Sequence, residues 1–365
     1  PPSMKRVRLV DIANRLNITK VSVSKALRDH PDISRETRAL VKKTAAEMGY
    51  TPNLLARSLS SQRSNTLGVV VPKIAHTFFS SVIDAIQEEA TKAGYGIVLA
   101  VSNETSALES QHIHRLLAMR VDGLLVSVSK EPPNLETYTH VRDMRVPLVF
   151  FDRQIHGLGF SSVTVDDHAG AQKAVDYLVG LGCRRIAHVA GTSDVEIGRA
   201  RRAGFEEACR RHGIDVPDEW LVEGGFDEWH GYDAFVRIIE SGRIPDAVFS
   251  VTFPVGLGIR GAMRMRAPEL LDRVRIAAFG EGGLNEFYTY PHICVRQPTR
   301  AIGRSALHLL LKEIESEGPV PEEYIILDTD IVTPETFDLS GRGASAMDRT
   351  AGEHAHGWQE RSRQT

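Results

Sequence analysis

The sequence predicts an α/β protein in which a small all-α head precedes two doubly wound parallel-sheet subdomains. Its 365 residues exceed what one hydrophobic core usually serves, which indicates several globular units. Helical periodicity dominates the first 50 residues. From residue 66 onward, continuous apolar runs alternate with amphipathic segments, as in parallel sheets covered by helices on both faces.

The composition is that of an ordinary globular protein. Apolar residues make up 42% and charged residues 25%, which excludes a wholly disordered, collagen-like or disulfide-scaffold chain. No apolar run approaches the ~20 residues of a membrane-spanning helix, and the first residues lack the apolar core of a secretion signal. Without a secretion signal we expect a cytoplasmic location. The three cysteines are widely spaced and form no metal-binding or redox pattern, so we expect reduced thiols and no metal; no cofactor is expected either.

Charge is distributed unevenly along the chain. Residues 1–63 carry 13 lysines and arginines against five acidic residues, whereas the remainder has a net charge of −11. A basic head on an acidic body is typical of a protein in which one module meets phosphates and the other avoids them. A solvated basic surface without a partner is the alternative.

The head is predicted to contain three helices. They run from Leu9 to Leu16, from Thr19 to about Arg28, and from Ser34 to about Met48. Asn17 tolerates the left-handed backbone of a tight turn, and Thr19 can cap the helix that follows. Pro31 ends the second helix, and Gly49 ends the third. Two helices joined by a tight turn make a helix-turn-helix unit, although other small helical bundles share this spacing.

A polar linker follows the head. Residues 53–59 could form two helical turns, which are marginal in water without a partner. We therefore expect this segment to be a conditional helix within residues 51–65. The predicted organisation is a head at 1–50, a hinge and linker at 51–65, a two-lobed body at 66–338 and a disordered polar tail at 339–365.

The body divides into two series of strands and helices. The first has strands at 67–72, 96–101 and 123–128 and helices at 79–94 and 106–120. The second has strands at 146–151, 185–190, 220–223, 247–251 and 274–279 and helices at 169–180, 200–212 and 231–241. A ligand held between two such sheets would contact residues just after the strands.

Specific motifs support a family resemblance. They occupy residues 7–13, 18–28, 33–38, 49–53 and 56–59 of the head and 151–153, 198–205, 297–298 and 302–303 of the body. In these motifs the chain resembles the LacI/GalR family of bacterial transcription regulators over about residues 7–335. The resemblance implies a dimeric repressor that binds a pseudo-palindromic operator and whose body is similar to periplasmic sugar-binding proteins.

The resemblance assigns DNA contacts to the head. Lys20, Val21 and Lys25 would read bases in the major groove, with lysine donating to guanine and valine meeting a thymine methyl group. The family more often has arginine at the Lys25 position, so we expect a point-charge contact there. The residues expected to hold phosphates are Thr19, Ser22 and Ser34.

The resemblance also implies that the linker helix binds in the minor groove of DNA, where it pairs with the same helix of a second subunit. The hinge positions are Asn53, Ala56 and Leu59, with Leu59 inserted between base pairs. The alternative is that the leucines of this segment pack on the body.

The resemblance also assigns an effector site. The expected contacts are Phe78, Phe79, Asn103, Asp152, Arg153, Arg201, Phe226, Trp229, Thr252 and Glu281. Arg201 would anchor an effector carboxylate or hydroxyls. For the aromatic residues ordinary core packing is an equal alternative, and for Arg201 a structural salt bridge.

The effector and the activity class remain open at this level. The resemblance implies a sugar-related metabolite as the effector. Thr252-Phe253 and Gly280 stand where the family often has acidic or amide residues, so a less polar effector or a protein signal is the alternative. Asp166-Asp167-His168 could be a metal or acid/base cluster, but acidic residues at a helix start more simply favour the dipole. No nucleotide, hydrolase or metalloprotease motif occurs. A regulator is therefore favoured over a DNA-targeted enzyme or a solute-binding protein.

Overall fold

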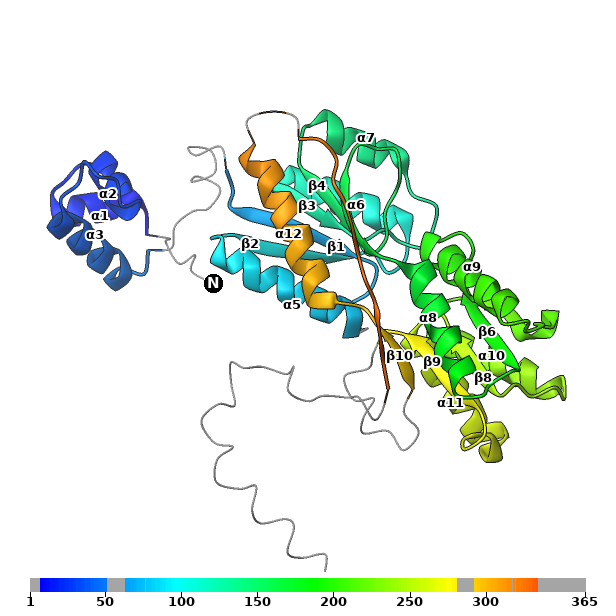
Figure 1. Cartoon of the computed structure of the whole chain (residues 1–365). Helices are drawn as coiled ribbons and strands as arrows, with labels where there is room; N and C mark the ends of the chain where they lie inside the picture. Colours follow the sequence, from blue (N-terminus) through cyan, green and yellow to red (C-terminus); the bar gives the residue numbers. More distant parts are fainter. Residues whose placement is uncertain are drawn as a thin grey trace, which may run out of the picture. The chain divides into compact units, whose positions relative to one another are not determined.

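The computed structural model describes residues 7–50, 63–75, 77–280, 292–316, 318 and 320–333. The chain divides into two units, Pro1–Asn65 and Thr66–Thr365, and each is described by itself (Figure 1). The predicted hinge helix at 53–59, Glu281 and the predicted tail at 339–365 lie outside the described residues.

The first unit contains the three expected helices. They are α1 (Leu9–Leu16), α2 (Lys20–Leu27) and α3 (Arg35–Glu47). Ile12, Val23 and Val41, one from each helix, are fully buried and form the centre of a small core. Because each helix has two or three turns, the head depends on this shared core for its stability.

The turn between α1 and α2 has the predicted geometry. Asn17 has a left-handed backbone with a φ of 51°, and its N–H lies at the carbonyls of Ala13 and Asn14. The Thr19 side chain accepts a hydrogen bond from the Ser22 N–H at 3.0 Å and so caps α2. The predicted helix-turn-helix is therefore confirmed.

The first lobe of the body contains a fully parallel six-stranded sheet. Its strands, in spatial order, are β11 (Tyr324–Leu327), β5 (Ser161–Val165), β4 (Leu148–Phe151), β3 (Gly123–Val126), β1 (Thr66–Val71) and β2 (Gly96–Val101). One face is covered by α5 (Thr77–Lys92) and α12 (Thr299–Glu315), and the other by α6 (Ser106–Ala118) and α7 (Leu135–Asp143).

The second lobe repeats this arrangement. Its strand order is β12 (Asp330–Val332), β10 (Ile293–Arg296), β9 (Arg275–Phe279), β8 (Ala247–Ser250), β6 (Ile186–Gly191) and β7 (Leu221–Gly224). All neighbouring strands are parallel except β10 and β12. The covering pairs are α8 (Asp167–Gly180) with α9 (Glu196–Arg211), and α10 (Glu228–Glu240) with α11 (Phe253–Arg266). Two doubly wound sheets were predicted, and that prediction is confirmed.

Three segments connect the lobes. The chain crosses after β5 into α8, after β10 into α12, and again between β11 and β12 (Figure 1). Residues 146–151 were predicted to belong to the second series of strands, and this prediction was wrong. The strand β4 pairs with β3 of the first sheet, with Val149 opposite Leu125. An apolar run identifies a buried strand but carries no information about which sheet it joins.

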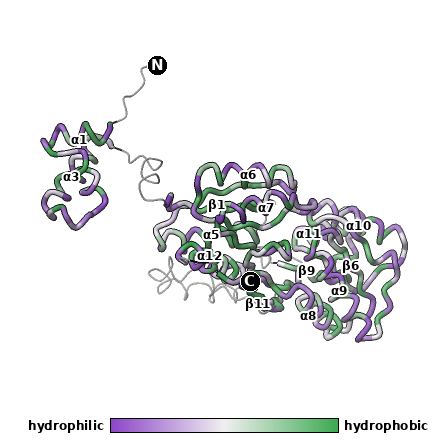
Figure 2. The backbone as a smooth tube through the Cα atoms, turned by 90° about the horizontal axis from the view of Figure 1, so that it is seen from above, coloured by the Kyte–Doolittle hydropathy of each residue, from purple (hydrophilic) through white to green (hydrophobic). Residues whose placement is uncertain are grey.

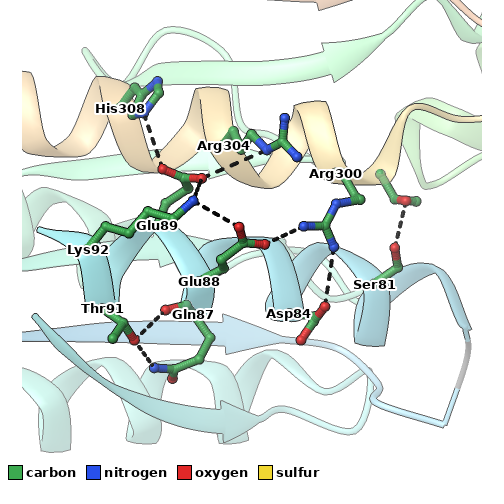
Figure 3. A network of polar contacts seen from close by, with 11 residues as sticks. Ser81, Asp84, Gln87, Glu88, Glu89, Thr91, Lys92, Arg300, Arg304 and His308 are labelled. Carbon is green, nitrogen blue, oxygen red and sulfur yellow. Dashed lines mark hydrogen bonds and ion pairs between the residues drawn. The ribbon is translucent and has the colours of Figure 1, made fainter. Parts of the chain in front are cut away.

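The helices that cover the sheets are amphipathic. In Figure 2, α6 changes between hydrophobic and hydrophilic residues along its length. Side chains from α5 and α12 also meet in a surface network: Arg300 pairs with Asp84 and Glu88, and Lys92 lies 2.8 Å from Glu88 (Figure 3). Among the described residues, no helix is both long and apolar enough to span a membrane.

Candidate functional site

The N-terminal turn of α2 is exposed on the surface of the head. Thr19 and Lys20 are exposed, and the Val21 side chain has an exposed fraction of 65%. At the start of α2 the hydroxyl groups of Thr19 and Ser22 form a hydrogen bond, with their oxygens 2.9 Å apart. A single exposed apolar side chain is ordinary on a protein surface, so Val21 by itself does not identify a contact surface.

Lys25 already has a partner within the head. Its Nζ lies 2.6 Å from Oδ2 of Asp32, in the segment that follows α2. The hydrogen bond from Lys25 lowers the pKa of Asp32, so Asp32 is ionised at neutral pH. Lys25 must therefore exchange this carboxylate for a base edge if it is to contact DNA.

Ser34 caps the third helix. Its hydroxyl oxygen accepts a hydrogen bond from the Thr37 N–H at 3.2 Å. The predicted phosphate contacts Thr19 and Ser34 thus sit at the starts of α2 and α3, where helix N–H groups favour anions. Asn53, Ala56 and Leu59 lie outside the described residues.

A second group of predicted residues lies where the strands of the first lobe end. Asp152 and Arg153 directly follow β4, and Asp152 has a left-handed backbone with a φ of 62°. Arg153 donates from Nη1 to Glu104, which follows β2, at 2.8 Å. Ser127, which follows β3, donates to Asp152 Oδ2 at 3.3 Å. The parallel topology therefore brings polar residues from three strand ends together.

Arg201 occupies the corresponding region of the second lobe. It extends from α9 and is only 2% exposed. Its Nε and Nη2 lie 2.8 and 2.7 Å from Asp167 Oδ1, and its Nη1 donates to the Val251 carbonyl at 2.6 Å. The guanidinium carbon lies 3.8 Å from the centre of the Phe279 ring. Asp167 is therefore the partner that Arg201 would have under the alternative interpretation, in which Arg201 forms a structural ion pair.

These two groups meet across the lobes. The Arg153 guanidinium carbon lies 5.2 Å from the centre of the Phe226 ring, which belongs to the second lobe. His156 of the first lobe also lies 3.0 Å from Glu196 of α9. We refer to Glu104, Asp152, Arg153, Asp167 and Arg201 as the interlobe ionic cluster.

Burial controls the titration of the acidic residues in this cluster. Desolvation raises the pKa of Asp152 to about 6, although Arg153 and Arg201 act in the opposite direction. Burial also raises the pKa of Asp167 despite its bonds to Arg201. Loss of water therefore outweighs the pairing with arginine at both carboxyl groups.

The other predicted effector residues occupy several environments. Phe79 is buried in the core of the first lobe, with Phe78 at its edge. Asn103 is exposed with a φ of 51°. Thr252 caps α11 and donates to the Phe226 carbonyl at 2.9 Å. Trp229 has an exposed fraction of 75% and packs edge-on against Tyr232.

The residues that partner the predicted arginines were not recognised as such from the sequence. Glu104 was not identified, although its position just after β2 was a signal for this edge of the sheet. Asp167 was interpreted as a residue that favours the helix dipole, in preference to a metal or acid/base cluster, and not as a partner of Arg201. Its neighbour Asp166 does cap α8, by accepting from the Ala169 N–H at 2.8 Å. Across the described part of the chain, no group of three or more His, Cys, Asp or Glu residues is placed to hold a metal ion.

Comparison with protein families gives two matches that together span most of the chain. Residues 8–53 match the model of bacterial regulatory proteins of the lacI family. Residues 64–331 match the model of periplasmic binding proteins and the sugar-binding domain of the LacI family.

Similar curated proteins are regulators. The transcriptional repressor PurR of Salmonella newport is 30% identical over 314 residues, which covers 83% of this chain and 89% of the relative. The catabolite control protein A of Priestia megaterium is 28% identical over 315 residues, covering 85% and 93%.

Solved structures show the same fold. A lac repressor dimer bound to operator and an anti-inducer has a TM-score of 0.79 and 23% identity, covering 92% of this chain and all of that one. The complex of the regulator CelR with cellobiose has a TM-score of 0.67 and 25% identity, covering 91% and 100%. The fold is therefore shared over both the head and the body.

Proposed function

The chain belongs to the LacI family of bacterial regulatory proteins, and on that premise we propose that it is a dimeric repressor in the cytoplasm. In this proposal the head binds a pseudo-palindromic operator. The two-lobed body binds a small-molecule effector related to sugars, and this effector changes the affinity for DNA.

The exposed N-terminal turn of α2 is the observation that carries this proposal. It would enter the major groove with Lys20, Val21 and Lys25 against base edges. Thr19, Ser22 and Ser34 would contact phosphates and set the register. Asn53, Ala56 and Leu59 would act in the minor groove as a hinge helix.

The effector would bind between the lobes, near the interlobe ionic cluster. Contacts such as Arg153 with Phe226 and His156 with Glu196 join the lobes in the described state. A ligand that changes these contacts would shift the equilibrium between two arrangements of the lobes. The remaining proposed contacts are Phe78, Phe79, Asn103, Trp229, Thr252 and Glu281.

The two alternatives from the sequence are less well supported. The relatives described above are named as repressors or as a control protein, which favours a regulator over a DNA-targeted enzyme. The match of residues 8–53 to a regulatory head disfavours a solute-binding protein with an incidental basic extension.

Selection from random duplexes tests the proposal. The purified full chain should enrich one pseudo-palindromic sequence, and a metabolite panel should contain compounds that change its affinity for that sequence. Failure to enrich any duplex at low salt would contradict the proposal. The sign of the metabolite effect would distinguish release from recruitment.

A further inference from the structure

Both arginines of the interlobe ionic cluster are already bound to groups of the chain. Arg201 directs Nε and Nη2 to Asp167 and Nη1 to the Val251 carbonyl. One face of its guanidinium lies on the Phe279 ring. Arg153 is held by Glu104 and lies over Phe226. A phosphate or carboxylate would have to displace Asp167 to reach Arg201 in bidentate geometry, and at Arg153 it would have to bind beside the carboxyl groups of Glu104 and Asp152.

The backbone donors at the strand ends are occupied in the same way. In the first lobe, the N–H groups of Ser129 and Lys130 donate to Glu109 and Glu104 at 2.6 and 2.8 Å. In the second lobe, the Ser193 N–H donates to Glu223 at 2.6 Å. Amide groups in such loops commonly hold phosphates. Here the chain supplies its own carboxylates to them.

The carboxyl groups of the cluster outnumber its guanidinium groups. Three carboxylates, of Glu104, Asp152 and Asp167, face two guanidinium groups. Arg199 and Arg202, on the first turns of α9, are also engaged, by the Ser193 carbonyl and by Glu206 and Glu223.

One buried donor in the cluster has no partner among the described atoms. Arg153 Nε makes no hydrogen bond, although the residue is only 6% exposed. It lies 3.8 Å from Oδ2 of Asp152, too far for a direct hydrogen bond. A hydroxyl group could accept from Nε and donate to the carboxylate, whereas a phosphate oxygen would meet the charge of Asp152.

From this arrangement we propose that the interlobe ionic cluster binds an uncharged or amine-bearing compound through hydroxyl or amine groups and rejects phosphorylated and carboxylated metabolites. The inference rests on the proposed effector-binding role of the body. It differs from the expectation that Arg201 anchors an effector carboxylate.

Matched compounds test this proposal on the full chain. The probes are ribose with ribose 5-phosphate, glucose with glucose 6-phosphate, gluconate and glucosamine, and inorganic phosphate against chloride at equal ionic strength. Thermal unfolding and calorimetric titration measure binding. We expect no stabilisation by inorganic phosphate, and any neutral or amine ligand should bind at least about tenfold more tightly than its anionic counterpart.

Two variants test whether the carboxylates bound to Arg153 and Arg201 are the reason why anions are rejected. This test does not require the natural effector. Glu104→Gln releases Arg153 and Asp167→Asn releases Arg201, so at least one folded variant should gain stabilisation by phosphate that the wild type lacks. Glu240→Gln, an exposed change on α10, is the matched control and should gain none. Anion binding by the wild type within tenfold of a neutral counterpart would overturn the proposal. So would the absence of any gain in both folded variants.

This outcome can be separated from the proposed function. A compound that binds the body without changing operator affinity would contradict the regulatory role and leave the charge preference intact. A phosphorylated compound that binds the body and changes operator affinity would contradict the charge preference and leave the regulatory role intact.

Discussion

At the residue scale, Asp152 and His188 are buried titratable groups with opposite effects. Burial raises the pKa of Asp152 to about 6, from an ordinary value of 3.8. Burial lowers the pKa of His188 from 6.5 to about 4; its ring stacks against both Phe205 and Phe249. As the pH falls from 6.5 to 4, the folded chain protonates Asp152 before the unfolded chain does, which adds stability. Over the same range the unfolded chain protonates His188 first, which removes stability.

Without the Asp152 carboxyl group, the effect of His188 on the pH dependence of stability should become measurable. Asp152→Asn keeps a side chain that tolerates the left-handed backbone and removes the buried charge. At pH 7.5 the variant should be more stable by up to about 3 kcal/mol. Its free energy of unfolding should fall more steeply than that of the wild type between pH 6.5 and 4. Urea unfolding at several pH values measures both effects, and parallel pH profiles would contradict the assignment.

Lys25 and Lys43 form a matched pair of lysines in the head. Lys25→Ala should weaken binding to the selected operator by about 1–3 kcal/mol and reduce discrimination against altered bases. Lys43→Ala removes an exposed charge from α3 and should weaken binding to all duplexes alike. Competition titrations with altered operators measure the difference. Equal discrimination in the two variants would show that Lys25 does not read bases.

The sequence identified individual residues of the interlobe ionic cluster but not which of them form pairs. The resemblance placed Asp152, Arg153 and Arg201 among the effector contacts, and the structure gathers these three near the lobe junction. Asp167 lies 34 residues before Arg201, and their pairing depends on how α8 packs against α9. Nothing local in the sequence specifies that contact.

At the scale of elements, α10 and α11 pack unusually closely. A Cβ added at Gly258 would lie 1.8 Å from the Glu228 carbonyl oxygen, so only glycine fits there. A Cβ at Gly231 would meet the Val255 carbonyl oxygen at 2.0 Å. Glycines thus allow the two backbones to approach on one face of the second sheet.

Two glycines of α11 provide a matched test of this contact. Gly258→Ala should lower the free energy of unfolding by about 1–3 kcal/mol, because the backbones must separate. Gly261→Ala meets only a Tyr232 side-chain atom at 3.7 Å and should raise stability by up to about 1 kcal/mol through helix propensity. Denaturant unfolding measures both; a stabilising Gly258→Ala would contradict the close packing.

The bounds of deeply buried strands and helices could be predicted from local sequence patterns. The predicted strand at 96–101 coincides with β2, and most other predicted elements agree within a few residues. Four strands were not identified: β5, β10, β11 and β12. The edge strand β11 alternates exposed and partly buried residues, so it lacks the continuous apolar run of a central strand. The sheet membership of β4 also depends on the crossovers, which are long-range features.

At the scale of the whole molecule, the charge asymmetry connects the two proposed activities. Residues 1–63 have a net charge of +8 and the remainder −11. The basic head would gain affinity for DNA by releasing counterions, whereas the acidic body would be repelled by phosphates. The interlobe ionic cluster, in which carboxyl groups outnumber guanidinium groups, would extend that avoidance of anions to the effector.

The salt dependence of operator binding tests the central claim most directly. Affinity of the full chain for its selected duplex and for a scrambled duplex would be measured between 50 and 300 mM salt. The account predicts that log affinity falls linearly with log salt for both duplexes, with the selected duplex bound at least about a thousandfold more tightly. Affinity that ignores salt, or equal binding to both duplexes, would contradict it.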